Sequence, residues 1–296
     1  MINSTGYTYA HEHLHIDLSG AKNNIDCRLD QYQPLCDEMR TLVSKGVLNI
    51  IEVTNRYMGR NAQFMLDLMR DTGINVLAST GYYTDHFYPP QVRTLSAQQL
   101  AAEMIDEIEN GIDGTALKAS VIAEIGTSEN GITDDEAKMF HAAALAHHAT
   151  GLPISTHTSF STMGEAQIAL LKKHGVALEN VVIGHCDLKD DIPQILRMLD
   201  QGVYVQFDTI GKNNYFPDTR RAAMLSALIS QGFAQRIMLS MDITRRSHLR
   251  ANGGSGFSYL IDTFVPMLLA AGISQSQVET LLRDNPAAFF NRHTGK

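Results

Sequence analysis

Tryptophan is absent from this sequence of 296 residues, cysteine occurs only three times, and 24 basic side chains stand against 32 acidic ones. The resulting net charge of -8 argues against a nucleic acid or an anionic membrane surface as the partner. Cys27, Cys36 and Cys186 are odd in number and irregularly spaced, which argues against a disulfide framework. We therefore expect a soluble protein of the reducing cytoplasm.

Long apolar runs are missing as well. No run approaches the roughly 20 residues that a membrane-spanning helix needs, and the first residues lack the basic-then-apolar order of a secretion signal. With 44% hydrophobic residues the chain can bury one large core, and its length suits an α/β barrel. No low-complexity linker or shift in composition divides it, so we expect one domain over residues 1–296.

Short apolar runs alternate with polar loops and amphipathic stretches along the chain. Eight runs have the character of strands: the stretch 6–18, Val47–Val53, Ile74–Thr80, Ala119–Ile125, Pro153–Thr158, Val181–Cys186, Val203–Phe207 and Ile237–Met241. Helical patterns separate them over Leu35–Lys45, Ala97–Asn110, Asp134–Thr150, Gly164–Lys173, Ile192–Gln201 and Thr219–Gln231. Continuous apolar strands imply a parallel sheet covered by helices. The pattern predicts a (β/α)₈ TIM barrel, with a doubly wound sheet as the alternative.

The stretch 6–18 carries a histidine or an aspartate on every second position: His11, His13, His15 and Asp17. This is the period of a strand, so the imidazoles of His11 and His13 should project from one face. Their Cα atoms would lie roughly 6.6 Å apart, close enough to meet one cation. The same residues match H-E-x-x-H, the zinc-protease signature, which works only on a helix. Tyrosine and threonine before the motif and a Ser-Gly pair after it favour the strand, and hence half of a metal site.

Four later strands have a polar residue at their C-terminal ends: Glu124, His157, His185 and Asp242. Barrel active sites are built at those ends, so four imidazoles and two carboxylates should meet at one mouth. Singly, such a histidine is usually a hydrogen-bonded loop residue and such an aspartate a helix N-cap. A buried carboxylate such as Glu124 is costly without a cation or donors. The conjunction predicts a site for zinc, manganese, iron or nickel.

These residues resemble the motifs of the phosphotriesterase family of the amidohydrolase superfamily, essentially from end to end. The resemblance rests on the first-strand His-x-His, the two single-histidine strands, Asn55-Arg56-Tyr57-Met58-Gly59-Arg60-Asn61, Ser79-Thr80-Gly81-Tyr82-Tyr83, Ala123-Glu124-Ile125-Gly126-Thr127, and Asp242 followed by Arg245-Arg246-Ser247. It implies two divalent metal ions per chain, with Zn²⁺ as the expected metal. His11, His13 and Asp242 would bind the more buried ion, and His157 and His185 the exposed one.

The fourth strand departs from the pattern of many relatives, in which a carbamylated lysine bridges the two ions. Glu124 occupies the corresponding position. Lys118 stands six residues earlier, roughly 20 Å down an extended strand and toward the wrong end of the barrel. Glu124 is therefore the expected bridge.

The resemblance implies hydrolysis by a hydroxide shared between two cations about 3.5–4 Å apart. Asp242 would be the catalytic residue that accepts its proton. Arg60, Arg245 and Arg246 follow the second and eighth strands, which in an acidic protein suggests a small anionic substrate. The alternative is that these arginines pair with neighbouring acids at the rim. Several other residues of strand-end loops could shape the pocket beside them: Tyr82, Tyr83, Phe160, Asn213, Asn214 and Tyr215.

We expect a carboxyl ester or a lactone, with or without a phosphate group, as the substrate. A phosphoester or phosphotriester hydrolase is the alternative, together with a metal-binding homologue that has little catalysis. A mononuclear, deaminase-like enzyme would bind one ion and leave Glu124 unused. The sequence leaves a homodimer open.

Overall fold

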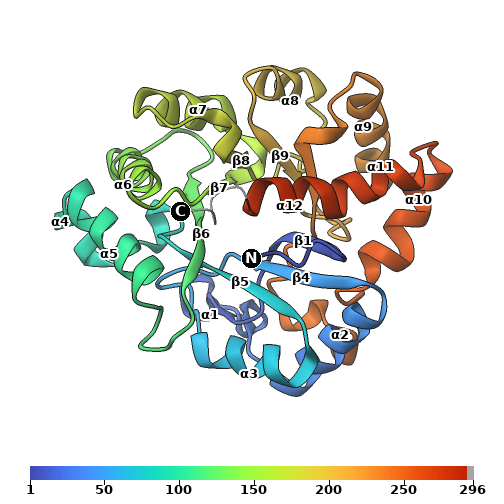
Figure 1. The fold of residues 1–296 in the computed structure, drawn as a ribbon, viewed down its shortest axis with the longest axis horizontal. Helices are drawn as coiled ribbons and strands as arrows, with labels where there is room; N and C mark the ends of the chain where they lie inside the picture. The colour runs from blue at the N-terminus through green and yellow to red at the C-terminus, as the bar shows by residue number, and fades with distance from the viewer. Residues whose placement is uncertain (292–296) are drawn as a thin grey trace.

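The computed structural model describes residues 1–291, and eight parallel strands form its central sheet. In the order of their hydrogen bonding these strands are β1 Tyr7–Glu12, β4 Val47–Glu52, β5 Asn75–Thr80, β6 Ala119–Thr127, β7 Ile154–Thr158, β8 Val181–Ile183, β9 Tyr204–Phe207 and β10 Ile237–Leu239. The order follows the chain without a reversal, and helices ring the curved sheet (Figure 1). The predicted (β/α)₈ barrel is confirmed, as a nearly closed barrel in one domain. The predicted boundary at residue 296 lies outside the described residues.

The seam between β10 and β1 is joined by the buried side chain of Glu12. Its Oε1 accepts hydrogen bonds from the hydroxyl of Ser240 and the amide of Met241, both at 2.7 Å, and its Oε2 accepts one from the amide of Ile243 at 2.9 Å. Burial raises the pKa of this carboxyl to about 7 despite these donors. The ends of the first and last strands are thus held together at the mouth of the barrel.

The helices alternate with the strands as the sequence pattern predicts. They are α1 Ser19–Lys22, α2 Tyr32–Ser44, α3 Ala62–Thr72, α4 Pro90–Thr94, α5 Ala97–Glu109, α6 Asp134–Thr150, α7 Gly164–Lys173, α8 Ile192–Leu199, α9 Asp218–Ser230, α10 Val265–Ala270, α11 Gln275–Glu279 and α12 Asn285–Phe290. Helix α6 has the predicted bounds because Thr133 and Glu136 form a capping box at its start and Gly151, at φ 75°, ends it. Within residues 1–291, no helix has the length and apolar character of a membrane span.

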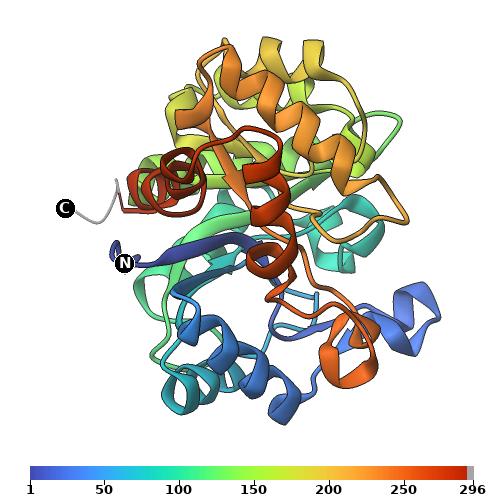
Figure 2. The same ribbon diagram turned by 90° about the vertical axis from the view of Figure 1, so that its right-hand side faces the viewer.

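Apolar side chains fill the barrel and also separate it from its helices. The cluster inside the barrel contains Ala10, Ile51, Val53, Leu77, Val121, Ala123, Val182, Tyr204 and Met238, together with Ile2, Phe289 and Phe290. Helix α12 brings the two phenylalanines to the end where the strands begin, and the amide of Ile2 donates to Asn291 Oδ1 at 2.8 Å. Figure 2 shows α12 and the N-terminus at the same end of the barrel. The opposite end, where the strands finish, is left for a site.

Two parts of the chain differ from the sequence prediction. The first strand ends at Glu12 instead of continuing to residue 18, and β2 (Ile16–Asp17) pairs with β3 (Arg28–Leu29) in a separate antiparallel ladder. His15 belongs to that turn, where its Nδ1 lies 2.6 Å from the carbonyl oxygen of Gly59. Helix α3 is not among the helical ranges named from the sequence; Asn61 caps it and Gly73 ends it at φ 77°.

Candidate metal centre

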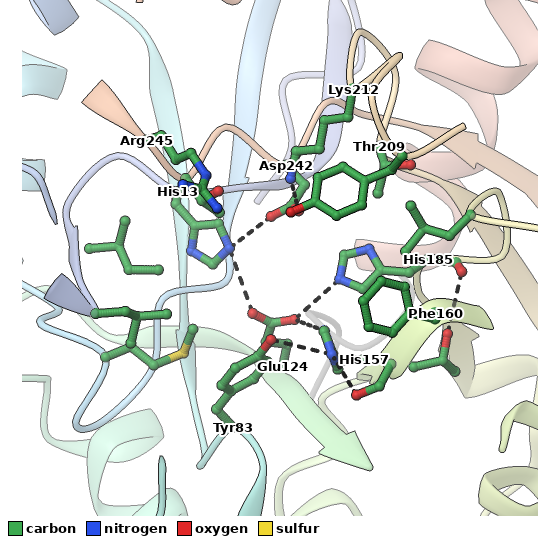
Figure 3. Close-up of a pocket in the computed structure, with 18 of the residues that line it drawn as sticks. His13, Tyr83, Glu124, His157, Phe160, His185, Thr209, Lys212, Asp242 and Arg245 are labelled. Carbon is green, nitrogen blue, oxygen red and sulfur yellow. Dashed lines mark hydrogen bonds and ion pairs between the residues drawn. The ribbon is translucent and has the colours of Figure 1, made fainter. Parts of the chain in front are cut away.

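The six predicted metal ligands converge at the C-terminal end of the barrel: His11, His13, Glu124, His157, His185 and Asp242. They come from β1, β6 and β7 and from the loops that follow β1, β8 and β10. Each residue is no more than 9% exposed. Figure 3 shows these side chains, apart from His11, turned toward one another around a cavity. Since His11 lies on a strand, the helical zinc-protease alternative does not apply.

The carboxylate of Glu124 lies at the centre of this group. Its Oε2 is 3.4 Å from His11 Nε2, 3.1 Å from His157 Nδ1 and 3.8 Å from His185 Nε2. Its Oε1 is 3.6 Å from His13 Nε2. One carboxylate therefore faces four imidazoles, three of them at Oε2 and one at Oε1.

The donor atoms fall into two groups that share Glu124. Within each group the atoms lie within 4.8 Å of one another: His11, His13 and Glu124 in one, and Glu124, His157 and His185 in the other. Asp242 extends the first group, because its Oδ1 is 3.2 Å from His13 Nε2 and 4.0 Å from His11 Nε2. Imidazole nitrogen with carboxylate oxygen is a donor set for Zn²⁺ and other first-row divalent ions.

Register shifts turn two of these side chains toward the site. In β6, Val121 and Ala123 face the barrel interior, so regular alternation would point Glu124 outward. The pairing of β6 with β7 shifts between Ile122 and Ile125, and Glu124 faces inward with the histidines. The pairing of β1 with β4 shifts in the same way between Tyr9 and Glu12, which lets Ala10 and His11 share the interior side. Bulges of this kind re-aim side chains next to active sites.

Two of the donors stand on left-handed backbone. His185 has φ 54° and Asp242 has φ 51°, each in the loop directly after its strand. This conformation costs about 1–2 kcal/mol for a residue with a Cβ atom. The surrounding contacts hold it, since the amide of His185 donates to both oxygens of Asp208 at 3.0 and 3.1 Å. Backbone strain of this kind concentrates at functional sites.

The outer nitrogens of the imidazoles have partners of their own. The pairs are His13 with Thr54 at 2.7 Å, His185 with Asp208 at 2.8 Å, and His157 with Tyr83 at 3.3 Å. Such partners orient a metal-ligating histidine and select its tautomer. The inner Nε2 of His11 is buried and makes no hydrogen bond to any described residue. This nitrogen lies beside the carboxylate of Glu124, and Gln206 and Asp208 contact the other nitrogen of the same ring. Such an arrangement is typical of a metal ligand.

The charges in the site favour a bound cation. Burial would raise the pKa of Glu124, but the charge of His11, with help from His157, holds it well below its usual value. Burial would lower the pKa of His11, yet Asp208 and Glu124 raise it to about 10. Asp208 and Glu124 therefore create a negative potential at the buried ring of His11. A negative potential of this kind favours the binding of a divalent cation.

Asp208 links the two donor groups from behind. Besides its contact with His185, its Oδ2 lies 3.3 Å from Nδ1 of His11, and Gln206 Oε1 is equally close to that nitrogen. The amide of Gln206 is fixed by a 2.9 Å hydrogen bond to the carbonyl oxygen of Ala10. One buried carboxylate thus orients a histidine of each group. The sequence analysis did not single out Asp208, although it directly follows the strand β9.

We expect Asp208→Asn to weaken metal binding about 10- to 100-fold, because the loss of an orienting carboxylate has that effect on a histidine ligand. Both groups that share Glu124 should be affected, since Asp208 contacts His11 of the first group and His185 of the second. Competition with a chromophoric chelator measures the affinities, and circular dichroism checks folding. Exposed Asp200→Asn is the matched control. Unchanged affinity at both positions would show that Asp208 has no orienting role.

Arg60, one of the predicted substrate residues, lies outside the cavity. Its guanidinium is paired with Glu107 at 2.7 Å and with Asp113 at 2.8 Å, and its side chain is only 3% exposed. Burial would lower its pKa, but the hydrogen bonds to these two carboxylates raise it. Arg60 therefore follows the alternative in which the arginine pairs with neighbouring acids, and it does not face the cavity.

Tyr82 and Arg246 also point away from the cavity, whereas Arg245 lines it. Tyr82 is 1% exposed and donates its hydroxyl to Glu103. Arg246 is paired with Asp30 at 2.6 Å. Consecutive residues after β10 therefore have different partners, and only Arg245 faces the donor groups.

The cavity beside the donor groups measures about 230 Å³. Two lysines line it that the sequence analysis did not single out, Lys22 from α1 and Lys212 from the loop after β9. Lys212 contacts the carboxylate of Asp242. Its position after a strand was a usable signal, whereas nothing in the sequence connects Lys22 with the strand ends.

An α/β barrel with imidazole and carboxylate donors at the ends of its strands defines the class of metal-dependent barrel hydrolases. Within that class the chain belongs to the phosphotriesterase family, whose sequence profile matches residues 2–290. The family assignment expected from the motifs is confirmed. The chain is accordingly an enzyme, a metal-dependent hydrolase.

Three comparisons illustrate the relationship. The chain is 67% identical to the phosphotriesterase homology protein of Escherichia coli K12 over 97% of this chain and 98% of that one. The crystal structure of that protein, complexed with phosphate in its active site, superposes with a TM-score of 0.97, 66% identity and coverage of 98% and 100% of the two chains. The N-acetyltaurine hydrolase of Danio rerio is 32% identical over 84% of this chain and 75% of that one. A lactonase from Listeria monocytogenes has a TM-score of 0.92, 28% identity and coverage of 97% and 95%.

Proposed function

We propose that this chain is a dinuclear metal-dependent hydrolase that cleaves a carboxyl ester or a lactone bearing an anionic group. The observation that carries the proposal is the position of Glu124. Its carboxylate lies 3.1–3.8 Å from nitrogens of four histidines that come from both flanks of the barrel. One metal ion needs three or four protein donors, whereas six donors around a shared carboxylate suit two. We expect Zn²⁺, two ions per chain, in a cytoplasmic protein whose three cysteines are unpaired.

The chain's own residues have separate tasks in this proposal. When bound, the two cations would lower the pKa of water and polarise a substrate oxygen. Glu124 holds the two donor groups at a fixed separation. Burial would raise the pKa of Asp242, but Lys212 and His13 hold it well below its usual value, so the carboxylate is ionised. Asp242 can then accept a proton from the attacking water.

A cationic wall supports an anionic substrate. It consists of Lys22, Lys212 and Arg245, which line the cavity beside the donor groups. His248 also lines the cavity, but burial and the charge of Lys212 lower its pKa to about 4, so its ring is neutral near pH 7. Arg245 is paired with Asp26 at 3.6 Å and also interacts with the hydroxyl of Tyr215. Guanidinium and ammonium groups in a protein of net charge -8 favour a phosphate, carboxylate or sulfonate on the substrate.

The relatives support both the anionic group of the substrate and the ester or lactone bond as the target. The E. coli structure contains phosphate in its active site, which agrees with an anion beside the donor groups. The similarity to a lactonase supports cleavage of a cyclic ester, and the similarity to N-acetyltaurine hydrolases supports an acyl group as the target. A phosphoester hydrolase is the second candidate, and the phosphate in the E. coli relative is the observation that favours it.

Metal removal and a substrate panel test the proposal together. The metal-free protein should have no hydrolytic activity, and titration with Zn²⁺ should restore it with an endpoint of about two ions per chain. The panel contains neutral esters, lactones with and without phosphate, N-acyl amino sulfonates and phosphoesters. Hydrolysis of anionic esters or lactones is the expected result. An endpoint of one ion, or turnover of phosphoesters alone, would contradict the dinuclear or the ester part respectively.

We expect Arg245→Ala to raise KM for anionic substrates about 10- to 100-fold, because a charge-assisted hydrogen bond contributes about 1.5–3 kcal/mol. The value of kcat and the kinetics with neutral esters should change little. The neighbouring residue provides the control: Arg246→Ala removes the same charge, but that guanidinium is bound to Asp30. Equal effects of the two substitutions would refute the cationic wall.

A further inference from the structure

Two large aromatic side chains are exposed at the mouth of the cavity. Phe160 is 52% exposed and Tyr215 is 48% exposed, and both line the cavity. Their ring centroids are 6.5 Å apart with an interplanar angle of 47°. Figure 3 shows Phe160 beside His185 and His157, across the site from Arg245 and His13. Water contact at two adjacent aromatic rings is unfavourable, and exposed apolar patches of this kind commonly mark binding sites.

The backbone of Phe160 is held in a conformation that few non-glycine residues adopt. Its φ of 52° and ψ of 41° are left-handed, and the following Ser161 has φ 58°. Side chains on either side of Phe160 anchor the turn: Ser159 Oγ donates to the carbonyl oxygen of Thr127 at 2.8 Å, and Ser161 Oγ donates to that of His185 at 2.6 Å. The anchored turn directs the phenylalanine ring outward over the cavity, and such a strained conformation suggests a function.

The loop that carries Tyr215 is rigid for a different reason. Asp218 accepts hydrogen bonds from the amide of Gly211 at 3.1 and 3.2 Å and from the side chain of Asn213 at 3.1 Å. The amide of Asp218 donates to Asn213 Oδ1 at 2.8 Å, and Arg221 is paired with the same carboxylate at 2.8 Å. Both rings are therefore presented from fixed positions, which reduces the entropy that a ligand would have to remove on binding.

We propose that Phe160 and Tyr215 form an aromatic lip that binds an apolar portion of the substrate and so determines specificity. This inference rests on the proposed function and deepens it. The cationic wall would hold the anionic group, and Phe160 would cover an alkyl or aryl group on the side of His157 and His185. Tyr215 extends the lip toward Arg245. The substrate class is then an ester or lactone with an anionic group and an apolar group on opposite sides of the scissile bond.

Binding of n-alkylphosphonates tests the lip without any catalytic turnover. The probes are the methyl, propyl, butyl and hexyl phosphonates, titrated calorimetrically into the metal-loaded protein. We expect the affinity of the wild-type protein to rise about 2- to 4-fold for each added methylene, the upper value corresponding to full burial of that group. In Phe160→Ala the affinity for methylphosphonate should stay within about 2-fold of wild type, while the dependence on chain length disappears.

Three further variants separate the lip from general effects. Tyr215→Phe should keep the dependence on chain length, and Tyr215→Ala should weaken it. Leu269→Ala removes an apolar side chain that is 42% exposed on α10, away from the cavity, and should behave as wild type. The proposal would be overturned if the affinity rose equally with alkyl chain length in the wild-type protein and in Phe160→Ala. So would a change from dimer to monomer in Phe160→Ala with the series unchanged, because the rings would then belong to an interface between two copies.

The lip and the proposed function fail in different ways. If the alkyl series rises but no ester or lactone is hydrolysed, the proposed function is wrong and the lip remains. If esters are hydrolysed but the alkyl series is flat in the wild-type protein, the lip alone is wrong. With hydrolysable substrates, Phe160→Ala should raise KM for long-chain esters and leave that for acetyl esters unchanged.

Discussion

Glu124→Ala is expected to lower kcat/KM by at least about 10³-fold, because a loss of several kcal/mol of transition-state stabilisation has that effect. The reason is geometric. This carboxylate is the one side chain shared by the two donor groups, so its removal leaves His157 and His185 as two isolated donors. The metal content should fall from about two ions per chain toward one or fewer, since two imidazoles do not complete a zinc site. Metal analysis of the purified protein, alongside steady-state kinetics, measures both effects.

Two companion variants make this result specific. Glu124→Gln keeps the size of the side chain but removes its charge, and should retain more metal than the alanine variant while turning over little substrate. Glu129→Ala removes an exposed glutamate from the loop after β6 and should change neither quantity. A Glu124→Ala protein with two ions and wild-type activity would falsify the shared-carboxylate arrangement. A wild-type protein with one ion, unaffected by the substitution, would favour the mononuclear alternative.

Asp242→Asn is expected to lower kcat at least about 100-fold, the usual contribution of a positioned general base. The asparagine oxygen can still serve as a neutral metal ligand near His13. It is too weak a base to accept the proton of the attacking water. KM should change less than kcat, because Asp242 acts on the reaction and not on the cationic wall. Kinetics are measured after metal content has been matched to wild type, so that a loss of metal cannot imitate a loss of the base.

The control for Asp242→Asn is Asp190→Asn, which removes an exposed carboxylate paired with Arg220. It should have wild-type kinetics. An Asp242→Asn protein that holds two ions and turns over at the wild-type rate would show that the proton goes elsewhere. The contact between Lys212 and Asp242 makes this substitution informative in a second way. Lys212 loses its charged partner in the asparagine variant, so any change in affinity for anions can be compared with that of Arg245→Ala.

The fold followed from local patterns that act over a few residues. Helix α6 has its predicted bounds because Thr133, Glu136 and Gly151 satisfy its ends with side-chain bonds and left-handed backbone. The boundaries of strands were less accurate, since strand ends depend on partners far along the chain. At the end of the first strand, the side chain of Glu12 bonds to Ser240 and Met241, which follow β10. No local pattern contains that information.

The substrate residues were predicted least well, and charge pairing explains why. Arg60 and Arg246 follow the correct strands, but each is paired with carboxylates of a neighbouring loop or helix. Whether an arginine faces a cavity or a neighbouring acid depends on the packing of loops, which composition does not specify. Lys22 is the opposite case. It lies in the short helix α1 and not at the end of a barrel strand, yet it lines the cavity.

The sequence by itself determined the barrel and the six candidate donor residues, because strand periodicity and the position of polar residues at strand ends are local properties. It also determined the family, through the motifs that resemble those of phosphotriesterases. Only the tertiary structure decided how those donors are aimed. Alternation along β6 would have turned Glu124 away from the site, and the register shift between Ile122 and Ile125 turns it inward. The tertiary structure also decided that Asp208 supports histidines of both donor groups and that the ring of Phe160 lies next to that of Tyr215 at the cavity. These arrangements depend on pairing and packing between segments far apart in the sequence, where no short-range pattern applies.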